Sequence, residues 1–169
     1  MNKVFFFDID GTLLPNGYDR QLDSTIHAIE QLNKKGYKVF IATGKNLKDA
    51  MWVGKILGIN NFVTTNGQTI SMNDEIIFEK LINKEDVQMW TNLAKKNDCL
   101  IGYQNNHERY ILESDKLGEL QRFFDLVKIA HPRVEKNVDF DFDVNQMIIV
   151  GEYEDLEYNR DIFKIVNWT

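Results

Sequence analysis

The residues "KVFFFDIDGTLL" (Lys3–Leu14) join a short apolar segment directly to two acidic side chains. Four consecutive apolar residues, Val4–Phe7, are typical of a strand that is covered on both faces in a parallel sheet. Asp8 and Asp10 follow at once, with one residue between them. Because an ionised carboxylate is costly to bury without a partner, we expect both at the end of the strand, facing something positive.

The segments that follow alternate between helix and strand patterns. Apolar residues recur at helical spacing up to Gly36, the expected helix end, and Asp23 or Ser24 is the expected N-cap. Two further strands are predicted, Tyr37–Gly44 and Phe62–Gly67. The helix between them is expected to end at Gly58 and to turn inward Leu47, Ala50, Met51, Gly54 and Leu57. Short connections between such elements predict a parallel α/β unit.

Polar residues cluster where each predicted strand ends. Ligands of open α/β sheets bind outside the carboxyl ends of the strands. One site is therefore expected to contain the residues that follow all three strands: Asp8 and Asp10, Thr43–Lys45, and Asn66 with Gly67.

A different pattern begins after Ile70 and predicts a second, α+β lobe. "EIIFEKLI" is expected to pair with a neighbouring strand. Two further strands, "CLIGYQ" and "RYILES", are expected to form a hairpin that turns at Asn105–Glu108. The other expected elements are helices at Lys84–Lys96, 115–128 and Asp155–Val166 and a strand at 147–152. We expect a boundary near Asn83, which divides the chain into residues 1–82 and 83–169.

Composition excludes several classes of partner. The net charge of −6 has the wrong sign for a protein that follows a nucleic-acid backbone. The apolar run Val4–Phe7 is too short to span a membrane, so we expect neither partner. Cys99 is the only cysteine, which excludes an intrachain disulfide and fits a cytoplasmic location.

Three motifs resemble those of the haloacid dehalogenase-like phosphatase superfamily. "DIDGT" (Asp8–Thr12) resembles its first motif, and "IATGK" (Ile41–Lys45) resembles its second. "TTNG" (Thr64–Gly67) resembles the third-strand turn of the Cof-type branch, in which a large α/β cap follows. The resemblance implies a partial Rossmann-like parallel sheet, with its strand order around a central first strand, and then an incomplete α+β cap domain.

The resemblance also implies roles for the two aspartates. Asp8 would attack phosphorus and form an aspartyl-phosphate, while Asp10 would act as the general acid and then the general base. Alternate residues of an extended segment point the same way, so both can reach one substrate. Mg²⁺ would offset the repulsion between carboxylates and phosphate. By resemblance, the Asp8 carboxylate and the Asp10 main-chain carbonyl are its ligands.

Five further residues are expected to bind a small phosphorylated substrate: Thr43, Gly44, Lys45, Asn66 and Gly67. Lys45 stands where Cof-type relatives usually have Arg, and lysine lacks the bidentate geometry of a guanidinium group. Each residue also has a plain structural interpretation. Thr43 is typical of a strand end, Lys45 of a solvated helix start, and Asn66 with Gly67 of a turn.

The family needs two more motifs, a lysine and a Gly-Asp strand end, that in Cof-type proteins follow the cap. The sequence to Thr169 contains no Gly-Asp pair, so we expect a truncated relative. Two function classes compete: a weak or inactive Mg²⁺-dependent phosphate-monoester hydrolase, and a catalytically silent remnant or binding module. A receiver domain also carries strand-end aspartates, but it explains neither the "DGT" and "TNG" motifs nor the second lobe.

Truncation has a consequence for the first strand. Without the strands that follow the cap, Val4–Phe7 is expected to form a sheet edge that no proline or charge interrupts. We therefore predict a homodimer, or aggregation, through this edge or the adjacent bare sheet face.

Overall fold

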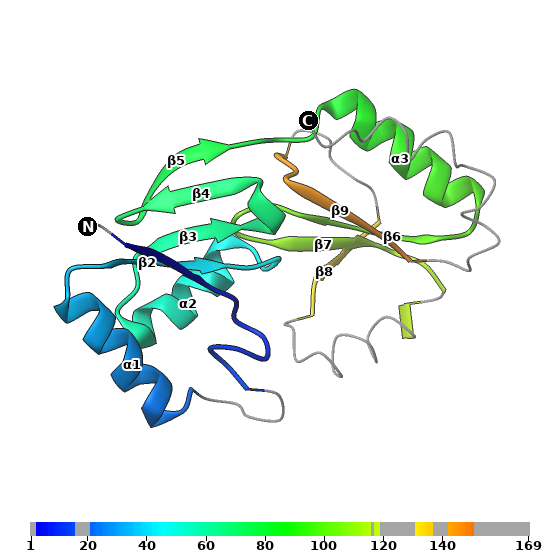
Figure 1. Cartoon of the computed structure of the whole chain (residues 1–169). Helices are drawn as coiled ribbons and strands as arrows, with labels where there is room; N and C mark the ends of the chain where they lie inside the picture. Colours follow the sequence, from blue (N-terminus) through cyan, green and yellow to red (C-terminus); the bar gives the residue numbers. More distant parts are fainter. Residues whose placement is uncertain (1–2, 16–20, 116, 119–130, 137–141, 151–169) are drawn as a thin grey trace. The chain divides into compact units, whose positions relative to one another are not determined.

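A computed structural model describes residues 3–15, 21–115, 117–118, 131–136 and 142–150 (Figure 1). The chain divides into two compact units. The first unit consists of the residues up to Leu81 together with Gln104–Glu108, and the second of Ile82–Tyr103 and the residues from Arg109 onward. The turn Gln104–Glu108, which the sequence analysis placed within 83–169, therefore groups with the first unit.

The first unit is built on a five-stranded sheet with the order β1-β2-β3-β4-β5. Its elements are β1 (Val4–Phe7), α1 (Asp23–Lys34), β2 (Lys38–Ala42), α2 (Leu47–Leu57), β3 (Asn61–Thr64), the 3₁₀ turn η1 (Thr65–Gly67), β4 (Thr69–Met72) and β5 (Glu75–Glu79). β1 pairs with β2, and β2 with β3, in parallel. β4 and β5 extend the sheet in antiparallel fashion. The predicted parallel α/β unit is confirmed, as is the pairing of "EIIFEKLI".

Both helices of this unit lie on one face of the sheet (Figure 1). The core between them and the sheet includes Ile29 of α1, Val53 of α2, and Ile41 and Phe62 of the strands. Met51 is 37% exposed, so its predicted place in the core was wrong. At 100° per residue, the buried positions 47, 50, 53, 54 and 57 all lie within about 60° of Ala50 around the helix axis, whereas position 51 lies about 100° from it.

The sequence predicted the C-terminal end of α2 correctly but not the N-cap of α1. Gly58 ends α2 with a left-handed φ of 66°, as predicted. The N-cap of α1 is Leu22, with no side-chain cap hydrogen bond. The predicted cap at Asp23 or Ser24 was therefore wrong, because the helix already begins at Asp23.

β1 lies at the edge of the described sheet, next to β2 alone. Phe7 packs against the core on the helix side. Because side chains alternate along a strand, Val4 and Phe6 face the other side, and they are 47% and 59% exposed. The central position that the family resemblance implies for this strand is not observed in the described sheet, where β1 lies at the edge.

The second unit has a four-stranded sheet with the order β8-β7-β6-β9. Its elements are α3 (Lys84–Lys96), β6 (Leu100–Gln104), β7 (Arg109–Leu112), β8 (Arg133–Glu135) and β9 (Gln146–Val150). The helix at Lys84–Lys96 and the hairpin around Asn105–Glu108 are confirmed. β8, parallel to β7, was not predicted. The helices predicted at 115–128 and Asp155–Val166 lie wholly or largely outside the described residues.

Packing in this unit centres on α3 and β6. Its buried cluster includes Val87 and Ala94 of α3, Ile101 and Tyr103 of β6, and Leu112 of β7. In the described part of the chain, no helix is both long and apolar enough to cross a membrane.

Candidate functional site

The two aspartates lie in a tight turn that directly follows β1. Ile9 and Leu13 are buried at 0% and 2% exposure and anchor this turn in the core. Asp8 and Asp10, on either side of Ile9, are exposed. Gly11 has a φ of 81°, a left-handed conformation that costs glycine little. The sequence pattern thus places apolar anchors inside and both carboxylates in solvent.

Thr43 follows β2 and is held by the neighbouring strand. Its amide donates to the carbonyl of Val63 at 2.9 Å, and its hydroxyl accepts from the amide of Lys45 at 3.3 Å. The side chain is only 8% exposed. The hydroxyl therefore orders the loop into α2, in agreement with the structural interpretation of this residue.

The charge that faces Asp10 in the structure is Lys45. Its Nζ lies 2.9 Å from Oδ2 of Asp10. The lysine side chain is 18% exposed and that of the aspartate 54%, so solvent screens the pair and its energy is modest. The sequence analysis expected a positive partner for the carboxylates but did not identify this lysine as one.

The third loop, η1, is attached to the second by its backbone. Thr65 donates its amide to the carbonyl of Lys45 at 2.9 Å, and Asn66 donates to that of Thr43 at 3.4 Å. Thr65, Asn66 and Gly67 have φ values of 49°, 55° and 91°. Three consecutive left-handed residues are unusual, and such strain persists only where surrounding contacts enforce it.

The side chain of Asn66 lies against Gly44. A Cβ added to Gly44 would be 3.0 Å from Oδ1 of Asn66, so a larger residue at position 44 would push this amide away. At Gly67 an added Cβ would meet nothing within 4 Å, and its glycine is explained by the positive φ instead.

The structure brings the predicted site residues together to different degrees. Contacts join Asp10 to Lys45, and Thr43 and Gly44 to the Asn66 turn. Asp8 is placed by register: β1 pairs in parallel with β2, with Phe7 opposite Ile41, so Asp8 and Thr43 follow adjacent strand ends. Their roles in binding or catalysis remain predictions.

One residue of the site was missed by sequence reasoning. Asn46 is 2% exposed and caps α2 by accepting a hydrogen bond from the amide of Asp49 at 3.0 Å. A signal existed, because an asparagine that precedes an apolar helical pattern by one residue is a common N-cap.

The donor set around the aspartates suits a magnesium ion with few protein ligands. Hydrogen bonds within the turn engage the carbonyls of Asp8, Ile9 and Leu14, which leaves the carbonyl of Asp10 outside them. Mg²⁺ commonly uses one or two carboxylates and retains several waters. No group of three or more histidine, cysteine or acidic side chains gathers for a metal within the described ranges.

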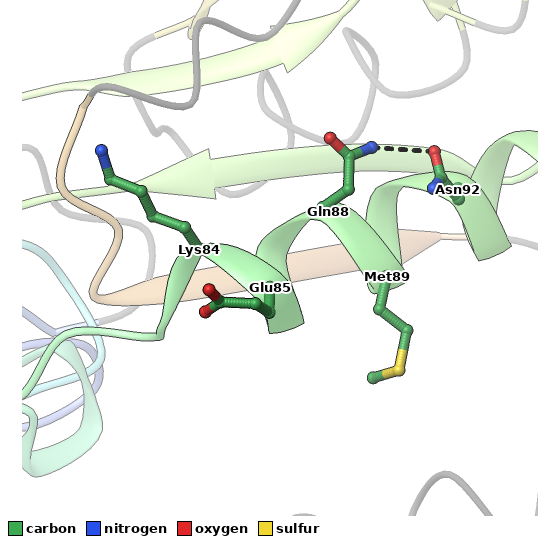
Figure 2. A pocket seen from close by; sticks show the side chains of 5 residues that line it. All are labelled: Lys84, Glu85, Gln88, Met89 and Asn92. Carbon is green, nitrogen blue, oxygen red and sulfur yellow. Dashed lines mark hydrogen bonds between the residues drawn. The ribbon is translucent and has the colours of Figure 1, made fainter.

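A separate hollow lies on α3 in the second unit. It is lined by Lys84, Glu85, Gln88, Met89 and Asn92 (Figure 2). Gln88 donates to Asn92 along the helix at 2.9 Å, and the other side chains are those of a solvated helix face. None of the predicted site residues lines this hollow, so it is not our candidate site.

Comparison with known proteins identifies a family. A family model described as haloacid dehalogenase-like hydrolase matches residues 5–166. The phosphoglycolate phosphatase of Nitrosopumilus maritimus is 29% identical over 140 residues, which are 81% of this chain and 57% of that protein. The 5-amino-6-(5-phospho-D-ribitylamino)uracil phosphatase YcsE of Bacillus subtilis is 33% identical over 100 residues, 57% of this chain and 39% of that protein.

Solved structures share the fold. A hypothetical protein from Geobacillus kaustophilus has a TM-score of 0.86 at 29% identity, over 97% of this chain and 63% of that one. A subclass IIB sugar phosphatase has a TM-score of 0.73 at 26% identity, over 93% of this chain and 62% of that one. The present chain therefore spans less than two thirds of each relative described here.

Proposed function

Because this chain belongs to the haloacid dehalogenase-like hydrolase family, we propose that it binds a small phosphorylated metabolite where β1, β2 and β3 end. We further propose that its chemistry is that of a Mg²⁺-dependent phosphate-monoester hydrolase of the Cof type, weak or inactive in this chain. The observation that supports this most is the 2.9 Å ion pair between Lys45 and Asp10, which joins the loops that follow β1 and β2.

In the proposed reaction, a carboxylate oxygen of Asp8 forms a bond to phosphorus as the bond to the ester oxygen breaks. Asp10, protonated on the carboxyl oxygen that does not face Lys45, would give this proton to the leaving oxygen and then take a proton from the water that hydrolyses the aspartyl-phosphate. Lys45 would orient Asp10 through Oδ2. Three groups would contact phosphoryl oxygens: the hydroxyl of Thr43, the main-chain amide of Gly44 and the side-chain amide of Asn66. Bound Mg²⁺ would neutralise charge on the phosphoryl group, held by the Asp8 carboxylate and the Asp10 carbonyl.

A catalytically silent binding module is the second candidate. It is favoured by the ion pair with Lys45, which already engages the carboxylate of Asp10. An Asp10 that stays ionised in this pair would have no proton to give to a leaving group. The two candidates share the same anion site and differ in turnover.

The deciding experiment measures both binding and turnover. Hydrolysis of an aryl phosphate would be followed with Mg²⁺, with excess chelator, and in Asp8→Asn, which preserves shape but removes the nucleophile. Loss of activity under both changes supports the hydrolase. Phosphate binding at the Gly44 and Asn66 amides without turnover supports the binding module. Activity that persists in Asp8→Asn would contradict a role for Asp8 as nucleophile.

We also propose a cytoplasmic location, from the single cysteine, and self-association through β1. The second proposal is supported by the position of β1 at the edge of the described sheet. The exposure of Phe6, 59%, supports it too, since an uninterrupted apolar edge is a template for pairing with another chain.

A further inference from the structure

A buried asparagine connects the turn Gln104–Glu108 to the loops of the candidate site. Asn106 is only 4% exposed, although it lies in a hairpin turn, where asparagine is usually solvated. Its Nδ2 donates to Oε1 of Glu79 at 2.6 Å, and its Oδ1 accepts from the hydroxyl of Thr69 at 2.9 Å. Both polar atoms of its side chain are thus engaged with one strand pair, β4 and β5.

The hydrogen bonds continue from Thr69 to the strained turn η1. The hydroxyl of Thr65 donates to that of Thr69 at 3.4 Å, which donates onward to Asn106. In this series of hydrogen bonds, from Thr65 to Thr69 to Asn106 to Glu79, every donor points toward the carboxylate of Glu79, so each bond polarises the next. Thr65 and Thr69 are fully buried, and a buried hydroxyl that lost its partner would be costly.

The same turn also holds the loop between β2 and α2. The main-chain carbonyl of Asn106 accepts from the amide of Lys48 at 3.0 Å, in the first turn of α2. Nε2 of Gln104, which is 3% exposed, donates to the carbonyl of Gly44 at 3.3 Å. The turn therefore contacts the segments on both sides of Lys45, as well as Thr65 indirectly.

From these contacts we infer that Asn106 is a positioning residue for the anion site. Its side chain supports the η1 turn through Thr69, and its turn supports the loop around Lys45 through Lys48 and, by way of Gln104, through Gly44. Glu79 anchors the Asn106 side chain. This inference rests on the proposed function for the identity of the ligand. It assigns to Glu79 and Asn106 a role that neither the sequence motifs nor the comparisons indicate.

The test reverses the polarity of the Asn106–Glu79 hydrogen bond. Asn106→Asp would place two carboxylates against each other, whereas the double variant Asn106→Asp with Glu79→Gln restores one donor and one acceptor. The readouts are the backbone ¹H–¹⁵N signals of Gly44 and Thr65–Gly67, and the Kd of inorganic phosphate in the presence of Mg²⁺. Asn92→Asp, the same substitution on the exposed face of α3, is the matched control.

We expect Asn106→Asp to shift these signals and to weaken phosphate binding about tenfold or more, the scale of a lost hydrogen bond to a charged group. The Kd of phosphate for the double variant should return to within about twofold of the value for the original protein. The Kd for Asn92→Asp should equal that of the original protein, because neither variant leaves a charge unpaired at this turn. If Asn106→Asp does not fold, Asn106→Ser, which removes the amide without adding charge, should change the same signals.

Unchanged Gly44 and Thr65–Gly67 signals in a folded Asn106→Asp or Asn106→Ser variant would overturn the inference. So would a loss of phosphate affinity that the double variant fails to restore. A wild-type chain that binds no phosphate would instead contradict the proposed function, while the signals measured without ligand would still decide the positioning role.

Discussion

At the scale of single residues, Lys45 is the side chain that most directly tests the candidate site. Lys45→Ala should weaken phosphate binding about tenfold, because it leaves the Asp10 carboxylate unopposed beside the anion. Its effect on the free energy of unfolding should stay below about 1 kcal/mol, because Asp10 is 54% exposed and solvent screens the pair. Titration with inorganic phosphate and thermal unfolding measure the two effects. Lys45→Arg, which keeps the charge, is the control.

Loss of stability without loss of affinity would contradict this assignment. It would make the ion pair a structural contact of the turn that follows β1 and leave the substrate-binding role of Lys45 without support.

Tyr103 gives a residue-scale prediction for the second unit. Burial raises its pKa above the ordinary value of 10.0, although a hydrogen bond with Thr91 opposes this shift. The unfolded chain therefore loses the phenolic proton first, so the free energy of unfolding should fall as pH rises above about 10. Below that pH this contribution is fully present. Chemical denaturation between pH 8 and 11 should show a shallower decline in Tyr103→Phe.

The phenylalanine variant should cost about 1 kcal/mol at neutral pH. The cost stays small because the Thr91 hydroxyl, 2.6 Å from the phenolic oxygen, is also 2.6 Å from the Val87 carbonyl and keeps that acceptor. Identical pH slopes for the two proteins would show that Tyr103 does not carry the alkaline dependence.

At the scale of elements, the packing of α2 on β3 depends on the absence of a side chain at Gly54. A Cβ there would lie 2.5 Å from both the carbonyl oxygen of Ile59 and Cζ of Phe62. Gly54→Ala should therefore push α2 from the sheet and destabilise the first unit by roughly 1–3 kcal/mol, the scale of overpacking a core. Urea denaturation measures this change.

Gly118→Ala is the matched control, because an added Cβ there meets nothing within 4 Å. The helix displacement should also shift the amide signals of Asn46 and Leu47, where α2 begins beside the candidate site. A Gly54→Ala variant as stable as the original protein would mean that α2 and β3 tolerate a wider spacing than the structure shows.

At the scale of the whole molecule, we predict that the exposed edge of β1 governs self-association. With Val4 and Phe6 exposed at 47% and 59%, we expect dimers or larger species at high micromolar concentration. Phe6→Lys should shift the population toward monomer, because a charge on an edge strand opposes pairing. Gel filtration with light scattering measures the mass. Ile77→Lys, at a 58% exposed position of β5, separates this edge from the other.

A monodisperse monomer of the original chain would contradict self-association through β1. Equal effects of the two lysine variants would indicate that general surface hydrophobicity, rather than the β1 edge, drives association.

Much of the fold followed from local patterns. Three local patterns predicted the parallel unit: the apolar run Val4–Phe7, the helical spacing before Gly58, and the polar residues at the strand ends. They could do so because burial on a sheet imposes a period on the sequence. The helix Lys84–Lys96 followed for the same reason, with acidic residues in its first turn and lysines in its last. The motifs that indicate the family are likewise local in the sequence.

The tertiary structure decided what depends on distance across the chain. No periodicity indicates that Lys45 would pair with Asp10, or that Asn106 would be buried against Glu79, since these partners meet only when separate strands come together. Local patterns record whether a residue is buried, because burial constrains each position singly, whereas hydrogen-bond and charge partners depend on two positions that the sequence alone does not connect.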